Sequence, residues 1–316
     1  MEIDLDRALE KLRDPDASAR QLAVMALEEL ADPESVEPLI RALRDPDATV
    51  RRLAAGVLEE LGDPRAVGPL VDALEDPVPQ VRATARTALR EFRSGEATLP
   101  LIAALGRPGA EVREAAILAL RELKDPRAIE PLKRCLRDPD PGVRREAVTA
   151  LGYLRERGAI PELRQALADS DASVRRLAIG ALSFFGQSQL IDDFVQALDD
   201  PDWQVRREAA IVLGRIEGAD VGPALVRALD DEAWQVIKEA AAGIAQRRVA
   251  AVEPLMRLLG HSHSDIRKNA ATALGAIGAL EAVDRLTALA EDNDVEVRKA
   301  ASRALNDIAM AGRVVQ

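Results

Sequence analysis

Short apolar patterns with helical spacing recur in pairs along the chain. In residues 35–43 and again in residues 50–61, apolar side chains return every three or four positions, which is typical of an amphipathic helix. Each pattern predicts a helix of about three turns, and no segment alternates apolar and polar residues long enough to predict a strand. Helices this short are marginal alone in water, so we expect each pair to bury its apolar faces against its neighbours.

One dipeptide sets the period of these pairs. Val-Arg returns every 31 residues, at Val50-Arg51, Val81-Arg82, Val112-Arg113, Val143-Arg144, Val174-Arg175 and Val205-Arg206. The same register holds at Ala19-Arg20, Val236-Ile237, Ile266-Arg267 and Val297-Arg298. Length alone favours about two domains, but a repeat of this kind overrides that expectation. The period predicts ten helical hairpins that form one continuous domain over residues 1–316.

Asp-Pro dipeptides stand between the predicted helices. Asp63-Pro64 precedes a first helix of a hairpin, and Asp45-Pro46 precedes a second helix. Aspartate accepts N–H groups at a helix start, and proline is tolerated in the first turn because its missing N–H is not needed there. Both kinds of dipeptide therefore predict helix starts, while Gly62 predicts the end of a helix.

A known repeat has this pattern. The segment 63–92, DPRAVGPLVDALEDPVPQVRATARTALREF, closely resembles the HEAT-like repeat first described in phycobilisome lyases, and the match recurs ten times. The resemblance implies an all-α, right-handed solenoid with first helices on the convex side and second helices on the concave side. It also implies that the arginine of each Val-Arg pair bonds to aspartates of neighbouring turns. Ile237 departs from this pattern by replacing the arginine, and Arg107 by replacing a capping aspartate.

Composition narrows the classes of partner. The 316 residues are 47% apolar and 2% aromatic, with a net charge of −11 and a pI near 5.0. An acidic chain repels phosphate backbones, so nucleic acid is disfavoured. Some alkylpurine DNA glycosylases resemble HEAT solenoids, but they rely on a basic concave face with aromatic residues.

The single cysteine, Cys135, excludes an internal disulfide and suits a reducing compartment. The N-terminus lacks the basic start and apolar run of a signal peptide, and no apolar stretch is long enough to span a membrane. We expect a cytoplasmic protein without a membrane partner. The charge of the end helices favours a monomer.

The sequence lacks the residues that a catalytic relative of this repeat uses. Deoxyhypusine hydroxylases resemble this repeat but carry His-Glu pairs that hold iron near the start of their second helices. The matching positions here read Arg145-Glu146, Arg207-Glu208 and Lys238-Glu239. Arginine and lysine are not ordinary metal ligands, so we expect no enzyme, no metal and no cofactor.

The two histidines of the chain, His261 and His263, lie with Asp265 in the sequence GHSHSD. Two imidazoles and a carboxylate are possible metal ligands. The favoured interpretation is an exposed turn before a helix, without a metal. Cys135 is interpreted as a small buried apolar residue rather than a reactive thiolate.

The two tryptophans occupy the same position in adjacent repeats. Trp203 precedes Gln204, and Trp234 precedes Gln235, at the predicted starts of second helices. Tryptophan is enriched among binding hot spots, so the two rings predict part of a partner-binding ledge. The alternative is that each ring covers its own helix start.

A basic row follows in the last six repeats, at Arg145, Arg176, Arg207, Lys238, Lys268 and Lys299. Such a row would suit an acidic peptide or protein surface. The alternative is that the next residues in sequence, Glu146, Glu208 and Glu239, neutralise it. Of two neighbouring aromatics, Phe184 is expected to be exposed and Phe185 to lie in the core.

Together these patterns predict a non-enzymatic scaffold that binds a protein or peptide on the concave face of repeats five to eight. The predicted contact residues are Trp203, Gln204, Arg207, Trp234, Gln235, Lys238, Arg176, Arg145 and Phe184. A subunit or chaperone of the chromophore (bilin) lyase type is the first alternative, although little aromatic or histidine content is present to hold a pigment. An engineered solenoid for assembly or display is the second.

Overall fold

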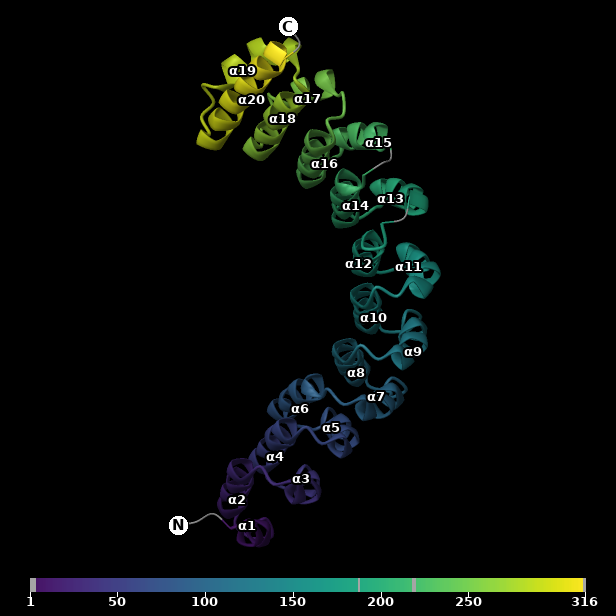
Figure 1. Ribbon diagram of the computed structural model, residues 1–316, viewed down its shortest axis with the longest axis vertical. Helices are drawn as coiled ribbons and strands as arrows, with labels where there is room; N and C mark the ends of the chain where they lie inside the picture. Colours follow the sequence, from purple (N-terminus) through teal and green to yellow (C-terminus); the bar gives the residue numbers. More distant parts are fainter. Residues whose placement is uncertain (1–3, 187, 218–219, 315–316) are drawn as a thin grey trace. The chain divides into compact units, whose positions relative to one another are not determined.

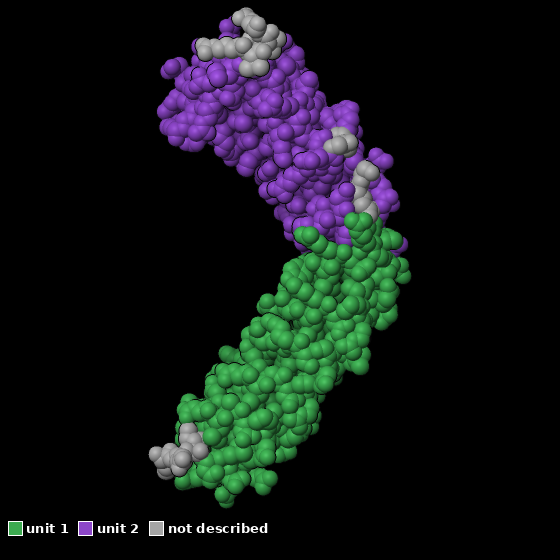
Figure 2. Space-filling model, viewed as in Figure 1, with its two compact units in different colours: residues 1–162 green, residues 163–316 purple. Residues whose placement is uncertain are grey.

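The structure is a computed structural model that describes residues 4–186, 188–217 and 220–314. It divides into two compact units, residues 1–162 and 163–316, coloured separately in Figure 2. Each unit is described by itself. Both ends of the predicted 1–316 domain lie outside the described residues, and its continuity as one domain stays a prediction.

All regular structure in the described part of the chain is helical, arranged as hairpins of a short first helix and a longer second helix. In unit 1 the first helices are α1 (Leu5–Lys11), α3 (Val36–Ala42), α5 (Val67–Ala73), α7 (Thr98–Ala104) and α9 (Ile129–Cys135). The second helices of unit 1 are α2 (Ala17–Leu30), α4 (Ala48–Leu61), α6 (Pro79–Glu91), α8 (Ala110–Leu123) and α10 (Pro141–Leu154).

Unit 2 continues the pattern, and the division between the units falls within α11. Its first helices are α11 (Ile160–Gln165), α13 (Ile191–Gln196), α15 (Gly222–Arg227), α17 (Val252–Leu258) and α19 (Val283–Leu289). Its second helices are α12 (Ala172–Ser183), α14 (Trp203–Arg215), α16 (Trp234–Arg247), α18 (Ser264–Ile277) and α20 (Val295–Val314).

Short 3-10 helices precede or follow most first helices. They are η1 (Pro33–Ser35), η2 (Pro64–Ala66), η3 (Gly95–Ala97), η4 (Pro126–Ala128), η5 (Arg157–Ala159), η6 (Ala166–Ala168), η7 (Ser188–Leu190), η8 (Ala197–Asp199), η9 (Ala228–Asp230) and η10 (Leu280–Ala282). Within each unit the second helices pack side by side in one layer, and the first helices lie on the other side of it (Figure 1). This arrangement is an all-α solenoid. The layer of second helices is called here the second-helix face.

The Asp-Pro dipeptides play two different roles. Before the first helices the prediction is confirmed: Asp63 accepts the N–H of Arg65 with Pro64 in the first turn of η2. Before the second helices it is wrong, because the helix starts later. Asp47, not Asp45, is the N-cap of α4, and its side chain accepts the N–H of Val50. Asp45 and Pro46 therefore lie in the segment that joins α3 to α4, and Pro46 is not part of the first turn of α4.

The core is built from small aliphatic side chains at the positions that the repeat predicts. The first residue of every Val-Arg pair is at most 1% exposed, from Val50 in α4 to Val297 in α20. Gly62 ends α4 with a φ of 62°, a left-handed conformation that glycine adopts without steric cost. Phe185 is 7% exposed, which confirms that it belongs to the core.

An ion-pair ladder joins consecutive turns, as the resemblance implies. At six steps the arginine in the Val-Arg register binds the aspartate 25 residues later with two N–H groups, as Arg113 binds Asp138. The shortest N–O distances are Arg20–Asp45 2.7 Å, Arg51–Asp76 2.6 Å, Arg113–Asp138 2.7 Å, Arg175–Asp200 2.7 Å, Arg206–Asp231 2.8 Å and Arg267–Asp292 2.8 Å. The remaining guanidinium nitrogen, Nη1, donates to carbonyl oxygens in the segment just before the arginine's own helix. Arg113 donates in this way to Arg107 and Pro108 at 2.9 and 2.8 Å. The ladder fixes the starts of neighbouring second helices to one edge of the layer.

Two departures from the repeat interrupt this ladder. Arg107 replaces an aspartate in unit 1 and turns back to the preceding repeat, where it pairs with Asp72 at 3.1 Å and with Glu75. Arg82, left without that aspartate, lies 3.9 Å from Glu111. In unit 2, Ile237 replaces a ladder arginine and is 6% exposed.

The close approach of α14 and α16 predicts opposite effects for two glycine substitutions. A Cβ atom on Gly214 would lie 2.8 Å from the Cα atom of Gly243, so Gly214→Ala should lower the free energy of unfolding by about 1–3 kcal/mol. Gly56 in α4 has open space around it, so Gly56→Ala should raise the free energy of unfolding by about 0.5–1 kcal/mol. Urea unfolding of both variants tests this, and a stabilised Gly214→Ala variant would contradict the close packing.

Candidate partner-binding face

Eight of the nine predicted contact residues belong to unit 2. Trp203, Gln204 and Arg207 lie on α14, and Trp234, Gln235 and Lys238 lie on α16. Arg176 lies on α12, and Phe184 is the residue that follows this helix. Arg145 lies on α10 in unit 1. The structure therefore groups the unit 2 residues on three adjacent second helices, α12, α14 and α16, and leaves Arg145 in the other unit.

The two tryptophans are the first residues of their helices. Trp203 begins α14 and is 36% exposed, while Trp234 begins α16 and is partly buried. Asp202 caps α14 by accepting the N–H of Gln204 at 2.8 Å. Because the ladder holds Asp231 against Arg206 of α14, both rings lie on the same edge of the second-helix face.

Trp234 takes part in an aromatic contact that the sequence patterns did not reveal. Its ring stacks on His263 with 4.9 Å between ring centroids and 21° between ring planes. His263 in turn stacks on His261 at 5.6 Å and 22°. The register places His263, the residue just before α18, one repeat beyond Ala233, but it does not show that the two rings touch.

The basic row is largely compensated by carboxylates. Glu239 lies between two of its cations, 3.5 Å from Arg207 and 3.9 Å from Lys238. Farther along unit 2, Lys268 pairs with Asp265 and Lys299 with Glu296, each at 2.8 Å. Of the three glutamates predicted to neutralise the row, Glu239 pairs with the cation just before it, Lys238. The other three of these cations pair with carboxylates that do not follow them in sequence.

Phe184 is far from the tryptophan edge. It is 60% exposed, as expected, and it follows the last residue of α12. A helix of 12 residues is about 18 Å long, so Phe184 and the start of α12 lie at opposite ends of the layer. A ligand that contacts both Trp203 and Phe184 must cross the width of the second-helix face.

The histidine turn contains the possible metal ligands His261, His263 and Asp265. Among the described residues, no group of three or more histidine, cysteine, aspartate or glutamate side chains is placed to hold a metal ion. His261 is half-buried, and its pKa is lowered by burial and by the nearby His263 and Arg267. The predicted exposed turn before a helix is correct for His263, whereas His261 is half-buried.

Cys135 is predicted to resist alkylation. Burial, and then the charge of Asp138, raises the pKa of its thiol from 9.0 to about 11. At pH 8 the thiolate population should be about a hundredfold below that of an ordinary cysteine, and burial slows access further. Iodoacetamide labelling followed by mass spectrometry measures this, with the urea-unfolded chain as the control. Equal labelling rates in the folded and unfolded chains would show that the thiol is accessible.

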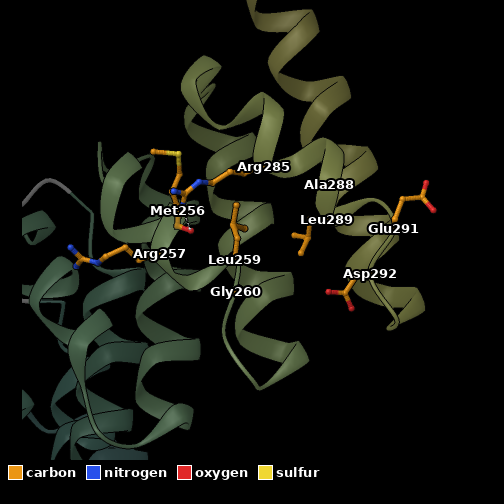
Figure 3. Close-up of a pocket in the computed structure, with 9 residues that line it drawn as sticks. All are labelled: Met256, Arg257, Leu259, Gly260, Arg285, Ala288, Leu289, Glu291 and Asp292. Atoms are coloured by element: carbon orange, nitrogen blue, oxygen red, sulfur yellow. Dashed lines mark hydrogen bonds between the residues drawn. The ribbon is translucent and has the colours of Figure 1, made fainter.

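A cavity of about 410 Å³ lies on the first-helix side of unit 2. It is lined by Met256, Arg257, Leu259, Gly260, Arg285, Ala288, Leu289, Glu291 and Asp292 (Figure 3). Two of its charged side chains are already engaged: Arg285 donates to the carbonyl oxygen of Met256 at 3.2 Å, and Asp292 binds the ladder arginine Arg267. In Figure 3, Arg257 extends away from the other residues. The cavity therefore lacks the converging polar groups of a small-molecule site.

The family model for HEAT repeats matches residues 5–90, 69–142, 132–194, 160–245 and 229–306. Among solved structures, an engineered protein is 25% identical with a TM-score of 0.53, and the match covers 98% of this chain and 99% of that one. No curated protein matches the chain significantly. Within the described residues, no helix is both long and apolar enough to cross a membrane.

Two larger solenoids resemble the chain in fold. A structure of Kap95p with RanGDP has a TM-score of 0.65 and one of importin β a TM-score of 0.61, each at 17% identity. Each match covers 96% of this chain, which spans 50% of the other. At this identity the likeness establishes the α-solenoid fold alone.

Proposed function

We propose that this chain, which belongs to the HEAT-repeat family, is a non-catalytic scaffold that binds a protein or peptide on the second-helix face of unit 2. Solenoids of stacked repeats present extended surfaces of this kind for binding. The observation that carries the proposal is the position of Trp203 and Trp234, the only tryptophans, at the starts of adjacent helices with Trp203 36% exposed. Exposed tryptophan at a regular position is typical of a binding hot spot.

The charge of the face shapes the expected partner. An acidic segment would compete with Glu239 for Arg207 and Lys238, so those cations contribute orientation more than affinity. We therefore expect apolar contact with the tryptophan edge to supply most of the binding free energy. Gln204 is exposed and Gln235 half-buried beside the rings, where their amides suit backbone groups of an extended peptide.

Affinity capture with three immobilised proteins tests the proposal. The wild type is compared with the Trp203→Ala/Trp234→Ala variant and with Leu280→Ala, which removes a side chain that is 66% exposed in η10 and away from the second helices. The lysate comes from the organism that encodes the chain. A partner retained by the wild type and by Leu280→Ala, but lost by the tryptophan variant, supports the proposal. Capture that survives the tryptophan substitutions would place the binding surface elsewhere.

The proposal includes a monomeric, cytoplasmic protein. A net charge of −11 opposes self-association, and a lone buried thiol suits a reducing compartment. Light scattering and cell fractionation measure these two properties.

An engineered repeat protein for assembly or display is the second candidate. The similarity to an engineered protein over nearly the full length of both chains favours it. In that case no natural partner exists, and capture would retain nothing specific. The resemblance of the repeat to that of phycobilisome lyases defines the enzymatic alternative, a bilin lyase-type subunit. A shift in bilin absorption on mixing with the chain would favour that alternative.

A further inference from the structure

The turn between α17 and α18 differs from most of the turns that precede second helices. In the usual turn an aspartate accepts the backbone N–H two residues later, as Asp231 does from Ala233 and Asp292 from Asp294, both at 2.8 Å. His261 occupies this position, and its Nδ1 atom accepts the N–H of His263 at 3.1 Å. Arg267 donates to the carbonyl oxygen of His261 at 2.8 Å, as ladder arginines do in their own turns. An imidazole has therefore replaced a carboxylate without changing the form of the turn.

The ladder partner of this turn is replaced as well. Ile237 stands where the preceding repeat normally supplies an arginine to the turn aspartate, in a repeat that is one residue short. At this joint, Ile237 therefore replaces the arginine of the ladder pair and His261 replaces the aspartate. The joint between α16 and α18 thus lacks a buried ion pair like that of Arg206 and Asp231 one repeat earlier.

A column of three rings occupies this joint instead. His261 stacks on His263, and His263 stacks on Trp234 at the start of α16. His263 contacts a ring on each side, and its backbone N–H is held by His261. The position of His263 on Trp234 therefore depends on the hydrogen bond to His261.

That hydrogen bond exists only with a neutral imidazole. Nδ1 can accept an N–H only when the ring proton is on Nε2, and protonation converts Nδ1 into a donor. A proton on His261 would place an N–H group against the N–H of His263. The turn would lose its acceptor, whereas a turn aspartate keeps its acceptor down to much lower pH.

The surrounding charges add to this effect. His263 and Arg267 are the charged groups that oppose protonation of His261. The nearby carboxylates are already committed to other cations: Asp265 to Lys268, and Asp292 to Arg267. On α16, Trp234 and Ile237 carry no charge, and the positive charge of Lys238 acts on Asp265. Asp265 and Asp292 thus each have a cation of their own, and Asp294 accepts the N–H groups of Glu296 and Val297.

We propose that the joint between α16 and α18 is a pH-sensitive switch, in which protonation of His261 releases the turn and the stack of His263 on Trp234. Because burial and neighbouring cations lower the folded-state pKa of His261 below 6.5, the unfolded chain binds a proton more readily than the folded chain does. The stabilisation from neutral His261 is therefore complete above about pH 6.5, and it is lost as the pH falls from there toward the folded-state pKa.

The test uses hydrogen exchange and histidine NMR on the full chain. With only two histidines, the Cε1–H resonances are assigned by His261→Asp and His263→Gln variants. Between pH 7.0 and 5.0, the protection factors of amides in residues 252–263 should fall several-fold in the wild type, with the fall beginning near pH 6.5. In His261→Asp, which restores the usual acceptor of the turn, they should stay constant over the same range. The His261 resonance should titrate below 6.5.

A second readout guards against a variant that is merely destabilised. In a Trp203→Phe background, where Trp234 is the only tryptophan, the fluorescence of Trp234 should follow the His261 titration. Adding Ile237→Arg and His261→Asp together restores an arginine–aspartate pair at this joint and should abolish the fluorescence change. The same pH dependence in the wild type and in His261→Asp, or a His261 resonance that titrates at or above 6.5, would overturn the proposal.

Discussion

Arg113→Ala should lower the free energy of unfolding by about 3–5 kcal/mol. The guanidinium of Arg113 and the carboxylate of Asp138 are each 10% exposed and lie 2.7 Å apart. Removing the arginine leaves the carboxylate of Asp138 partly buried without its cation. It also removes the hydrogen bonds to the carbonyl oxygens of Arg107 and Pro108 in its own turn. The hydrogen bond to Asp138 raises the pKa of Arg113, in keeping with a strongly held pair.

Arg82→Ala is the matched control for this prediction. Arg82 holds the same position one repeat earlier, but Arg107 replaces its aspartate, and its nearest carboxylate is Glu111 at 3.9 Å. Its side chain is 31% exposed, so its loss should cost about 1 kcal/mol or less, including the bond to the carbonyl of Asp76. Urea unfolding monitored by circular dichroism compares the two variants. Equal losses would mean that the ladder aspartates contribute little to the stability of the stack.

Trp203→Ala/Trp234→Ala should weaken partner binding at least about 30-fold, equivalent to about 2 kcal/mol, while leaving helicity intact. Both residues lie at the first position of a helix, so the interior of α14 and α16 keeps its packing. Most of the loss should come from Trp203, because Trp234 already stacks on His263. Isothermal titration calorimetry with the captured partner measures the effect.

Two control variants show whether the affinity depends on an aromatic ring at position 203 and on this face alone. Trp203→Phe keeps an apolar ring and should retain most of the affinity, whereas Leu280→Ala should bind as the wild type does. Unchanged affinity in the double alanine variant would remove both tryptophans from the binding surface.

The fold could be predicted because every repeat contains the same pair of apolar segments with helical spacing. A single pair of short apolar segments is ambiguous, but ten copies in one register leave few alternatives to stacked hairpins. The start of α4 was misplaced because Asp45 and Asp47 both suit an N-cap, and only the geometry shows which of them accepts the N–H of Val50. Asp45 is instead required by Arg20 of the preceding repeat, a contact between residues 25 positions apart.

The candidate site was predictable only in part. The shared position of Trp203 and Trp234 follows from the period, and the exposure of Phe184 follows from its place after a helix. The contact of Trp234 with His263 depends on how α16 and α18 approach each other, which a pattern within one repeat does not contain. Ile237 was visible as a departure from the repeat. Its connection with His261 emerges only when the hydrogen bonds of equivalent turns are compared.

The central claim is that a partner lies on the second-helix face of unit 2, and hydrogen exchange of the captured complex tests it most directly. Amides at the starts of α14 and α16, around residues 203–208 and 234–239, should gain protection on binding, while those of the first helices α13 and α15 should not change. Protection confined to α13, α15 and the η10 region would contradict the account and assign binding to the opposite layer.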